Sequence, residues 1–125
     1  MAVAYTSRVS ESDIHVISTP ITTERLRELA QEYFGDMIKA VVDVRLNLLA
    51  LGGELHSDEE LALIKQGSQQ ADLWGINIYF EQSRSDRIEY DSMINIRPRQ
   101  NNRSRHVENE QTRQRIADVV DALIL

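Results

Sequence analysis

The sequence predicts an α+β fold: a single domain with a mostly antiparallel sheet packed against two to three helices. Alternating apolar and polar residues in 73–80 and 87–96 indicate two strands, whereas apolar residues three and four apart in 24–34 indicate an amphipathic helix. The connections between such segments are short, and 125 residues suffice for one core. We therefore expect a flexible tail over 1–12 and a single domain over 13–125.

The first elements of the domain are a short strand and a helix. Residues 13–18 (DIHVIS) alternate weakly, which predicts the strand. The helix begins at Glu24, because Thr22 or Thr23 can cap it and the amphipathic pattern starts there. Gly35 is a natural terminator of this helix.

The segment 37–51 has two interpretations. Residues 37–44 (MIKAVVDV) and 47–51 (NLLAL) predict two antiparallel strands joined by a tight turn. Arg45-Leu46 is poor turn chemistry, so a single helix through 37–50 remains the alternative.

A second helix is predicted after the pair Gly52-Gly53. Ser57 and Glu60 have the spacing of a capping box, which places the start of the helix at this serine. Gly67 should end it.

The segments 73–80 and 87–96 flank a polar turn region and predict a hairpin. The apolar face of its first strand carries Trp74, Ile76, Ile78 and Phe80. The core face of its second strand carries Ile88, Tyr90, Ser92, Ile94 and Ile96. The polar residues expected together on the opposite face are Asn77, Tyr79, Asp91, Asn95 and Arg97.

Pro98 should stop the second strand of this hairpin, and Asn109 is a plausible cap for a last helix. The apolar stripe of that helix consists of Ile116, Val119, Val120, Leu123 and Ile124.

Composition excludes several classes of protein. A net charge of −6 argues against non-specific binding of duplex DNA, which needs accumulated positive charge. Without cysteine, the chain has no disulfides and no thiolate metal site, and no apolar run is long enough for a signal peptide or a membrane span. We expect a cytoplasmic protein that does not contact membranes.

Catalytic and metal motifs are missing from the sequence. His15, His56 and His106 lack the spacing that places two imidazoles on one metal, and neither a GxSxG elbow nor a phosphate-binding glycine loop occurs. The group Glu54, His56 and Asp58 is better explained as the polar entrance of a helix than as a cation site. We therefore expect a non-enzyme without metal or cofactor.

The segment 97–105 (RPRQNNRSR) carries the strongest functional signal. It holds four arginines and no lysine, and twelve of the fourteen basic residues of the chain are arginine. Arginine binds phosphate with paired donors and also pairs with, or stacks on, guanine. The pattern favours a small, specific anion. The predicted ligand-binding residues are Asp91, Asn95, Arg97, Arg99, Asn102, Arg103, Ser104 and Arg105.

The roles within this set follow from side-chain chemistry. Arg99 and Arg103 would hold phosphate or stack on guanine, with Arg97 and Arg105 in support. Asn102 and Asp91 would read base edges, because a carboxylate accepts hydrogen bonds from guanine N1 and N2. The hydroxyl of Ser104 and the amide of Asn95 complete the set.

Three other interpretations stay open. The segment 97–105 could be a solvated turn whose arginines pair with Glu108 and Glu110, and such surface pairs contribute under about 1 kcal/mol. A small RNA nuclease or phosphoryl-transfer enzyme would use Arg103 or Arg105 with His106 or His56 as acid/base. A ligand-free adaptor would dock the same arginines on an acidic protein surface.

The order of several segments resembles a known family. DMIKAVVDV, GGELHSDEE, DLWGINIYF and DSMINIRPRQNNRSR, followed by an amphipathic helix, are similar to small prokaryotic proteins long described as a domain of unknown function. In cyanobacteria the resemblance is to a cyclic di-GMP receptor that controls cell size through a transcription regulator. It implies a receptor or effector that binds cyclic di-GMP and a protein partner. We also expect a homodimer, because a two-fold ligand suits a two-fold site.

Overall fold

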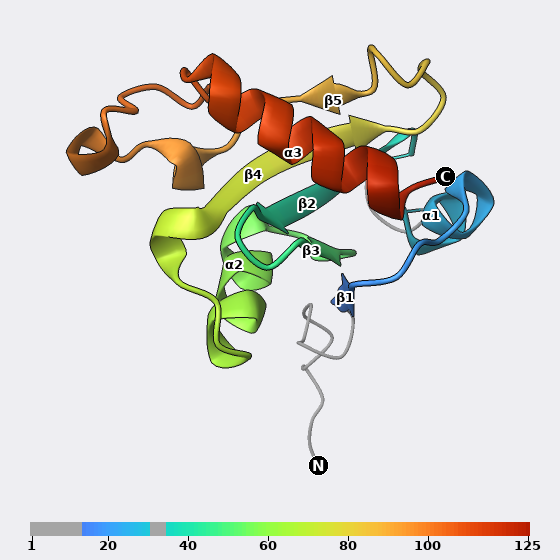
Figure 1. The fold of residues 1–125 in the computed structure, drawn as a ribbon. Coiled ribbons are helices and arrows are strands. Elements are labelled where there is room, and N and C mark those ends of the chain that lie inside the picture. The colour runs from blue at the N-terminus through green and yellow to red at the C-terminus, as the bar shows by residue number, and fades with distance from the viewer. Residues whose placement is uncertain (1–13, 31–34) are drawn as a thin grey trace.

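The computed structural model describes residues 14–30 and 35–125 (Figure 1). The predicted tail over 1–12 lies outside the described residues, as do residues 31–34 of the predicted first helix. The described residues form a five-stranded antiparallel sheet in the order β1-β3-β2-β4-β5 with three α-helices, so the α+β prediction is confirmed.

The strands are β1 (His15–Ile17), β2 (Met37–Asp43), β3 (Leu48–Leu51), β4 (Leu73–Tyr79) and β5 (Ile88–Glu89). The α-helices are α1 (Thr23–Ala30), α2 (His56–Lys65) and α3 (Glu110–Leu123). Within the described residues, the chain also forms the short 3-10 turns η3 (Gln70–Asp72), η4 (Met93–Asn95) and η5 (Pro98–Gln100).

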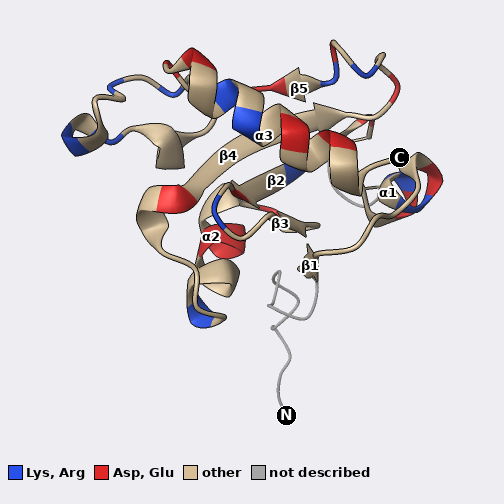
Figure 2. Ribbon diagram, in the orientation of Figure 1, with Lys and Arg blue, Asp and Glu red and all other residues tan. Residues whose placement is uncertain are grey.

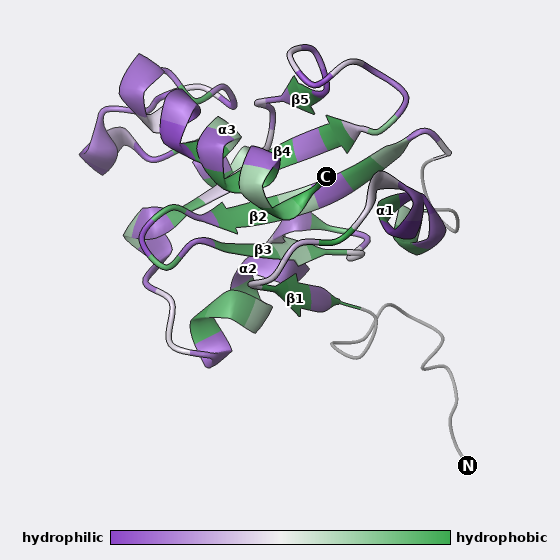
Figure 3. Ribbon diagram, turned by 45° about the vertical axis from the view of Figure 1, so that its right-hand side comes forward, coloured by the Kyte–Doolittle hydropathy of each residue, from purple (hydrophilic) through white to green (hydrophobic). Residues whose placement is uncertain are grey.

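Helices cover both faces of the sheet. Apolar side chains of α1 and α3 form the main core with alternate residues of β2, β3 and β4. Figure 3 colours the hydrophobic positions of these strands green. α2 packs on the opposite face, where Leu63 joins a smaller cluster with Val41, Ala50 and Leu73. The apolar face predicted for β4 is confirmed, because the main core includes Trp74, Ile76, Ile78 and Phe80.

The two-strand interpretation of 37–51 is confirmed, and the helical alternative is wrong. β2 and β3 pair from Ala40↔Leu51 to Asp43↔Leu48. The buried carboxylate of Asp43 accepts hydrogen bonds from the backbone N–H of Arg45 and of Leu46, each at 2.8 Å. Asn47 closes the turn with a φ of 58°, a conformation that asparagine tolerates. The flanking residues therefore supply the turn chemistry that Arg45-Leu46 lacks.

The second predicted helix exists, but its predicted capping box is wrong. α2 begins at His56 after Leu55, which makes no side-chain cap, so Ser57 lies inside the first turn and Glu60 lies just beyond it. The carboxylate of Glu59 instead reaches back to the N–H of Gly53 at 2.9 Å. The helix ends as predicted before Gly67, whose φ is 110°.

The predicted hairpin is confirmed only near its turn. β4 pairs with β5 at Asn77↔Glu89 and Ile78↔Ile88, but the strand predicted through residue 96 is wrong beyond Glu89. The chain there turns through η4, where the Ser92 hydroxyl accepts from the N–H of Ile94 at 3.3 Å. As a result, Ile94 packs beside the smaller apolar cluster and Ile96 is exposed.

A buried asparagine explains why this strand ends. The amide of Asn95 accepts from the N–H of Gly75 at 2.8 Å and donates to the carbonyl oxygen of Gly75 at 3.0 Å. A side chain thus takes the place of a sheet ladder pair. Only glycine lets the segment that carries Ser92 and Asn95 lie this close to β4, because a Cβ at Gly75 would lie 2.6 Å from the side chain of Ser92.

The last helix is confirmed with its predicted cap. Asn109 accepts from the N–H of Thr112 at 2.9 Å, and the predicted apolar stripe of α3 is buried. Backbone hydrogen bonds connect the end of α3 to the segment before α1. The N–H of Ile21 donates to the carbonyl oxygen of Leu123 at 2.8 Å, and the N–H of Leu125 donates to the carbonyl oxygen of Ile21 at 2.9 Å. In the described part of the chain, no helix is long and apolar enough to cross a membrane.

Candidate functional site

The arginine segment folds into a closed loop at the end of the molecule where β4 begins (Figure 1). Arg97 and Asn102 exchange backbone hydrogen bonds of 2.6 and 3.1 Å, which close a small ring around η5. Asn101 turns the chain with a φ of 60°. The loop backbone is therefore held by its own hydrogen bonds.

Arg97 points inward and fastens this loop to the sheet. Its guanidinium donates to the carbonyl oxygens of Ile94 at 2.9 Å, Gln70 at 2.9 Å and Leu73. It also lies over the ring of Trp74, 4.8 Å from the ring centroid. Its donors are occupied by the protein itself.

The charge of Arg97 is balanced by a carboxylate on α2. Glu60 lies 3.5 Å from the guanidinium, and the two side chains are only 12% and 10% exposed, respectively. Burial lowers the pKa of Arg97, while the charge of Glu60 acts in the opposite direction. This buried pair joins the loop to the helix on the far face of the sheet.

Asn102 holds the return of the loop. It is buried, and its amide group donates to the carbonyl oxygens of Asn95 at 2.7 Å, His106 at 2.6 Å and Ser104 at 3.1 Å. Its oxygen accepts from the N–H of Glu108 at 2.8 Å. The amide is fully used, as is that of Asn95, which also donates to the carbonyl oxygen of Arg105 at 3.0 Å.

Glu108 organises the outer part of the loop. One carboxylate oxygen, Oε2, accepts from the N–H of Arg103 and of Ser104, each at 3.0 Å, and from the Ser104 hydroxyl at 2.7 Å. These hydrogen bonds, first that of the hydroxyl, lower the pKa of Glu108. Among the described residues, the carboxylate thus bonds to two backbone N–H groups and a hydroxyl of the loop, and not to an arginine side chain.

Arg99 and Arg103 are presented to solvent. Both residues are exposed, and no group within the described residues accepts a hydrogen bond or forms an ion pair with either guanidinium. The segment 97–105 contains no acidic residue of its own. Figure 2 shows the loop as a run of basic positions that projects from the body of the molecule.

Arg105 and Asp91 form an ion pair at the surface of the loop. Arg105 Nε lies 2.6 Å from Asp91 Oδ1, with side chains 55% and 40% exposed. Such a pair contributes little to stability because water screens it. The carbonyl oxygen of Asp91 lies 3.4 Å from the amide of Asn77, so the pair adjoins the polar end of β4.

The predicted polar sheet face is therefore divided. Asn77 and Tyr79 meet at Glu89 Oε1, at 2.9 and 3.1 Å. Asn95 and Arg97, predicted for the same face, belong instead to the interior of the loop because the strand ends before them.

A pocket of about 390 Å³ opens beside the loop. Trp74 lies at one wall and the first turn of α3 at another. Its lining residues are Trp74, Gln100, Asn101, Asn102, Glu108, Asn109 and Thr112. The pocket thus adjoins the backbone between the two free arginines.

The histidines are not gathered at this site. His106 is exposed, with Nε2 3.4 Å from the guanidinium of Arg113 and its ring edge-on to Tyr90. His56 is buried on α2, where Nε2 lies 2.7 Å from the carbonyl oxygen of Ile76. No group of His, Asp and Glu able to hold a metal occurs in residues 14–30 and 35–125.

Burial makes His56 sensitive to acid. Desolvation lowers its pKa from 6.5 to about 4, so its contribution to stability is complete above pH 6.5 and is lost as the pH falls through 4. Buried Glu59 has the opposite sign, because desolvation raises its pKa above 4.5 and its contribution is lost as the pH rises. A variant at His56 separates its pH-dependent contribution to stability from that of Glu59.

When the pH falls from 7 to 5, the free energy of unfolding of wild type should decrease by about 2 kcal/mol more than that of the His56→Gln variant, because glutamine does not titrate. Urea denaturation at both pH values measures this difference. A pH-independent difference between the two proteins would contradict the burial of an uncharged His56.

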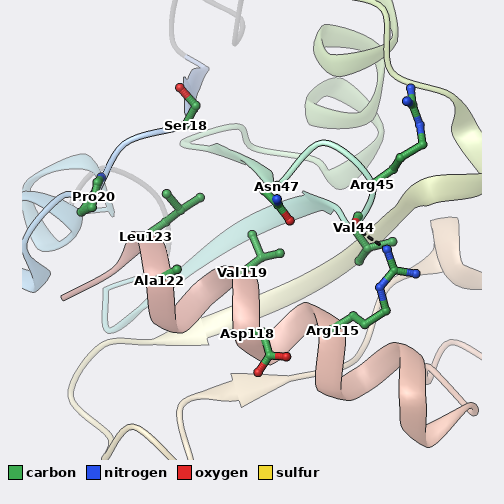
Figure 4. Close-up of a pocket in the computed structure, with 10 residues that line it drawn as sticks. All are labelled: Ser18, Pro20, Val44, Arg45, Asn47, Arg115, Asp118, Val119, Ala122 and Leu123. Carbon is green, nitrogen blue, oxygen red and sulfur yellow. Dashed lines mark hydrogen bonds between the residues drawn. The ribbon is translucent and has the colours of Figure 1, made fainter.

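A larger cavity lies away from the arginine loop. It measures about 670 Å³ and lies between the turn after β2, the segment before α1 and the C-terminal half of α3 (Figure 4). Arg115 crosses one end, where it donates to the carbonyl oxygen of Val44 at 2.6 Å. None of the residues predicted to bind a ligand lines this cavity.

The structure brings the eight predicted residues into one region but gives them different surroundings. Arg97, Asn95 and Asn102 are occupied inside the loop, Ser104 is bonded to Glu108, and Arg99, Arg103, Arg105 and Asp91 are at the surface. Sequence reasoning missed Trp74 and Glu108 as pocket residues. Glu108 had a signal, since it is the first acidic residue after the arginines, whereas Trp74 had none.

Comparison with known proteins gives a family without an assigned activity. A family model described as "Protein of unknown function (DUF5674)" matches residues 15–123. No curated protein and no solved structure matches the chain.

Proposed function

The chain belongs to the DUF5674 family of unknown function, and from that premise we propose that it is a receptor for cyclic di-GMP. The observation that carries the proposal is the pair Arg99 and Arg103, exposed on a closed loop without protein partners. The identity of the ligand comes from the resemblance described above, and the chemistry of the loop supports it.

The loop is suited to phosphate. Charge-assisted hydrogen bonds from arginine to phosphate are among the strongest in proteins, and a guanidinium can supply two at once. Arg99 and Arg103 flank three residues of backbone that Asn102 and Arg97 fix from below. Fixing the backbone before binding reduces the entropy that binding must lose.

The pair Arg105 and Asp91 supports recognition of a base. Their exposed ion pair exchanges readily for contacts with a ligand, since screening by water leaves it little net energy. Asp91 then accepts from guanine N1 and N2, and Arg105 stacks on the purine. Arg97, Asn95, Asn102 and Ser104 act by positioning these groups.

Binding alters the surface at the loop and thereby the affinity for a protein partner. We propose a transcription regulator as that partner, with cell size as the controlled property, on the strength of the resemblance alone. A homodimer fits the two-fold symmetry of the ligand. The receptor acts without catalysis and without a cofactor.

Calorimetric titration with cyclic di-GMP tests the proposal, with cyclic di-AMP and GTP as competitors for specificity. We expect saturable binding of cyclic di-GMP alone. The Arg99→Ala/Arg103→Ala variant should bind at least about 100-fold more weakly, because each lost charged hydrogen bond costs about 1.5–3 kcal/mol. The Arg25→Ala/Arg84→Ala variant removes the same charge elsewhere on the surface and should bind like wild type.

Absence of heat with every nucleotide would refute the receptor. RNA cleavage that is lost on His106→Ala would then favour the nuclease, in which Arg103 and Arg105 stabilise charge. Equal losses in the two double-arginine variants would mean that net charge, and not the loop, governs binding.

A further inference from the structure

The pocket beside the loop contains one carboxylate with a free oxygen. Glu108 Oε2 takes all three hydrogen bonds from Arg103 and Ser104, and no donor within the described residues reaches Oε1. The same three bonds fix the carboxylate in place and lower its pKa, so it is an ionised acceptor at neutral pH. Glu108 lines the pocket.

Trp74 lines the same pocket and carries a donor. Trp74 is only 6% exposed, and its indole N–H has no hydrogen-bond acceptor among the residues that the structure describes. Arg97 covers one face of the ring, which fixes its orientation. The N–H is accessible at the pocket wall, so it can donate to an acceptor on a ligand that enters the pocket.

An acceptor anion and a neutral donor in one pocket suit the edge of guanine. Guanine presents O6 as an acceptor beside two donors, N1–H and the 2-amino group. Adenine presents an acceptor at N1, which a carboxylate would repel. The remaining pocket groups, the amides of Gln100, Asn101 and Asn109 and the hydroxyl of Thr112, can satisfy further base atoms.

We infer that this pocket is a guanine subsite in which Glu108 Oε1 accepts from N1–H and the 2-amino group, and Trp74 donates to O6. The inference rests on the proposed receptor function, since the phosphates of the same ligand would bind Arg99 and Arg103. It assigns base specificity to two residues outside the arginine segment.

The test changes one group on the protein and one on the ligand, and compares the four dissociation constants. Cyclic di-IMP is cyclic di-GMP without the 2-amino groups. The Glu108→Gln variant removes the negative charge but keeps a side-chain oxygen that can accept the hydrogen bonds from Arg103 and Ser104. We expect wild type to bind cyclic di-IMP at least about tenfold more weakly than cyclic di-GMP. In Glu108→Gln this ratio should fall by at least about threefold, because only Asp91 still reads a 2-amino group, on the second guanine of the ligand. Glu110→Gln makes the same charge change nearby and should behave like wild type.

Each outcome is decisive. Equal discrimination by wild type and Glu108→Gln, with cyclic di-GMP still bound, would overturn the subsite and leave the receptor intact. A wild type that binds cyclic di-GMP and cyclic di-IMP equally would also overturn it. A wild type that binds neither would refute the receptor and the subsite together.

The single tryptophan gives a second measurement, needed if Glu108→Gln loses both ligands. Fluorescence of wild type should change saturably with cyclic di-GMP, with the same dissociation constant as calorimetry. Binding that leaves the emission and the acrylamide quenching of Trp74 unchanged would exclude the base from this pocket.

Discussion

The Arg97→Met variant is expected to lose about 3–5 kcal/mol of unfolding free energy. The substitution leaves Glu60 as a buried carboxylate without its cation and removes the donors to three carbonyl oxygens. Methionine keeps the apolar length of the side chain, so the loss reports the charge and the hydrogen bonds. Urea denaturation at pH 7 measures it.

Arg99→Met is the matched control, two residues away in the same arginine segment. Because Arg99 is exposed and unpaired among the described residues, the change should stay within about 0.5 kcal/mol. Two variants of equal stability would contradict the inward position of Arg97.

The Asn102→Ala variant should lose about 3 kcal/mol or more. Its amide makes four hydrogen bonds to backbone groups inside the loop, and removal leaves partly buried donors and acceptors without partners at about 1–3 kcal/mol each. Some of those groups regain water, which limits the total. Thermal and urea denaturation measure the loss.

Asn101→Gly is the control at the neighbouring position. Glycine accepts the φ of 60° without strain, so stability should change by less than about 1 kcal/mol. If Asn102→Ala were as stable as Asn101→Gly, the loop would not depend on the buried amide. The closed loop would then be no fixed platform for a ligand.

Hydrophobic periodicity predicted most of the fold, because burial on one face imposes a period of two or 3.6 residues. It failed where side chains bond to backbone. Ser92 and Asn95 end the second strand of the hairpin through such bonds, and Asp43 supplies a turn that Arg45-Leu46 does not encode. The capping box failed because the helix begins at His56, one residue before the serine, and Glu60 contacts Arg97 in a distant segment.

The candidate site was predictable in composition but not in the role of each residue. The spacing of RPRQNNRSR does not reveal that Arg97 reaches Gln70 and Leu73 while Arg99 faces water. That difference arises from the packing of the loop on the start of β4. For the same reason Trp74, more than twenty residues upstream, could not be connected with the pocket.

The most direct test of the central claim is an NMR titration of the ¹⁵N-labelled protein with cyclic di-GMP. The account predicts saturable shifts of the backbone amides from Arg99 to Ser104, of the Nε–H of Arg99 and Arg103, and of the Trp74 indole N–H. Residues around the larger cavity, such as Asn47 and Ala122, should not shift. Shifts confined to that cavity, or a spectrum that cyclic di-GMP leaves unchanged, would contradict the claim that the arginine loop is the receptor site.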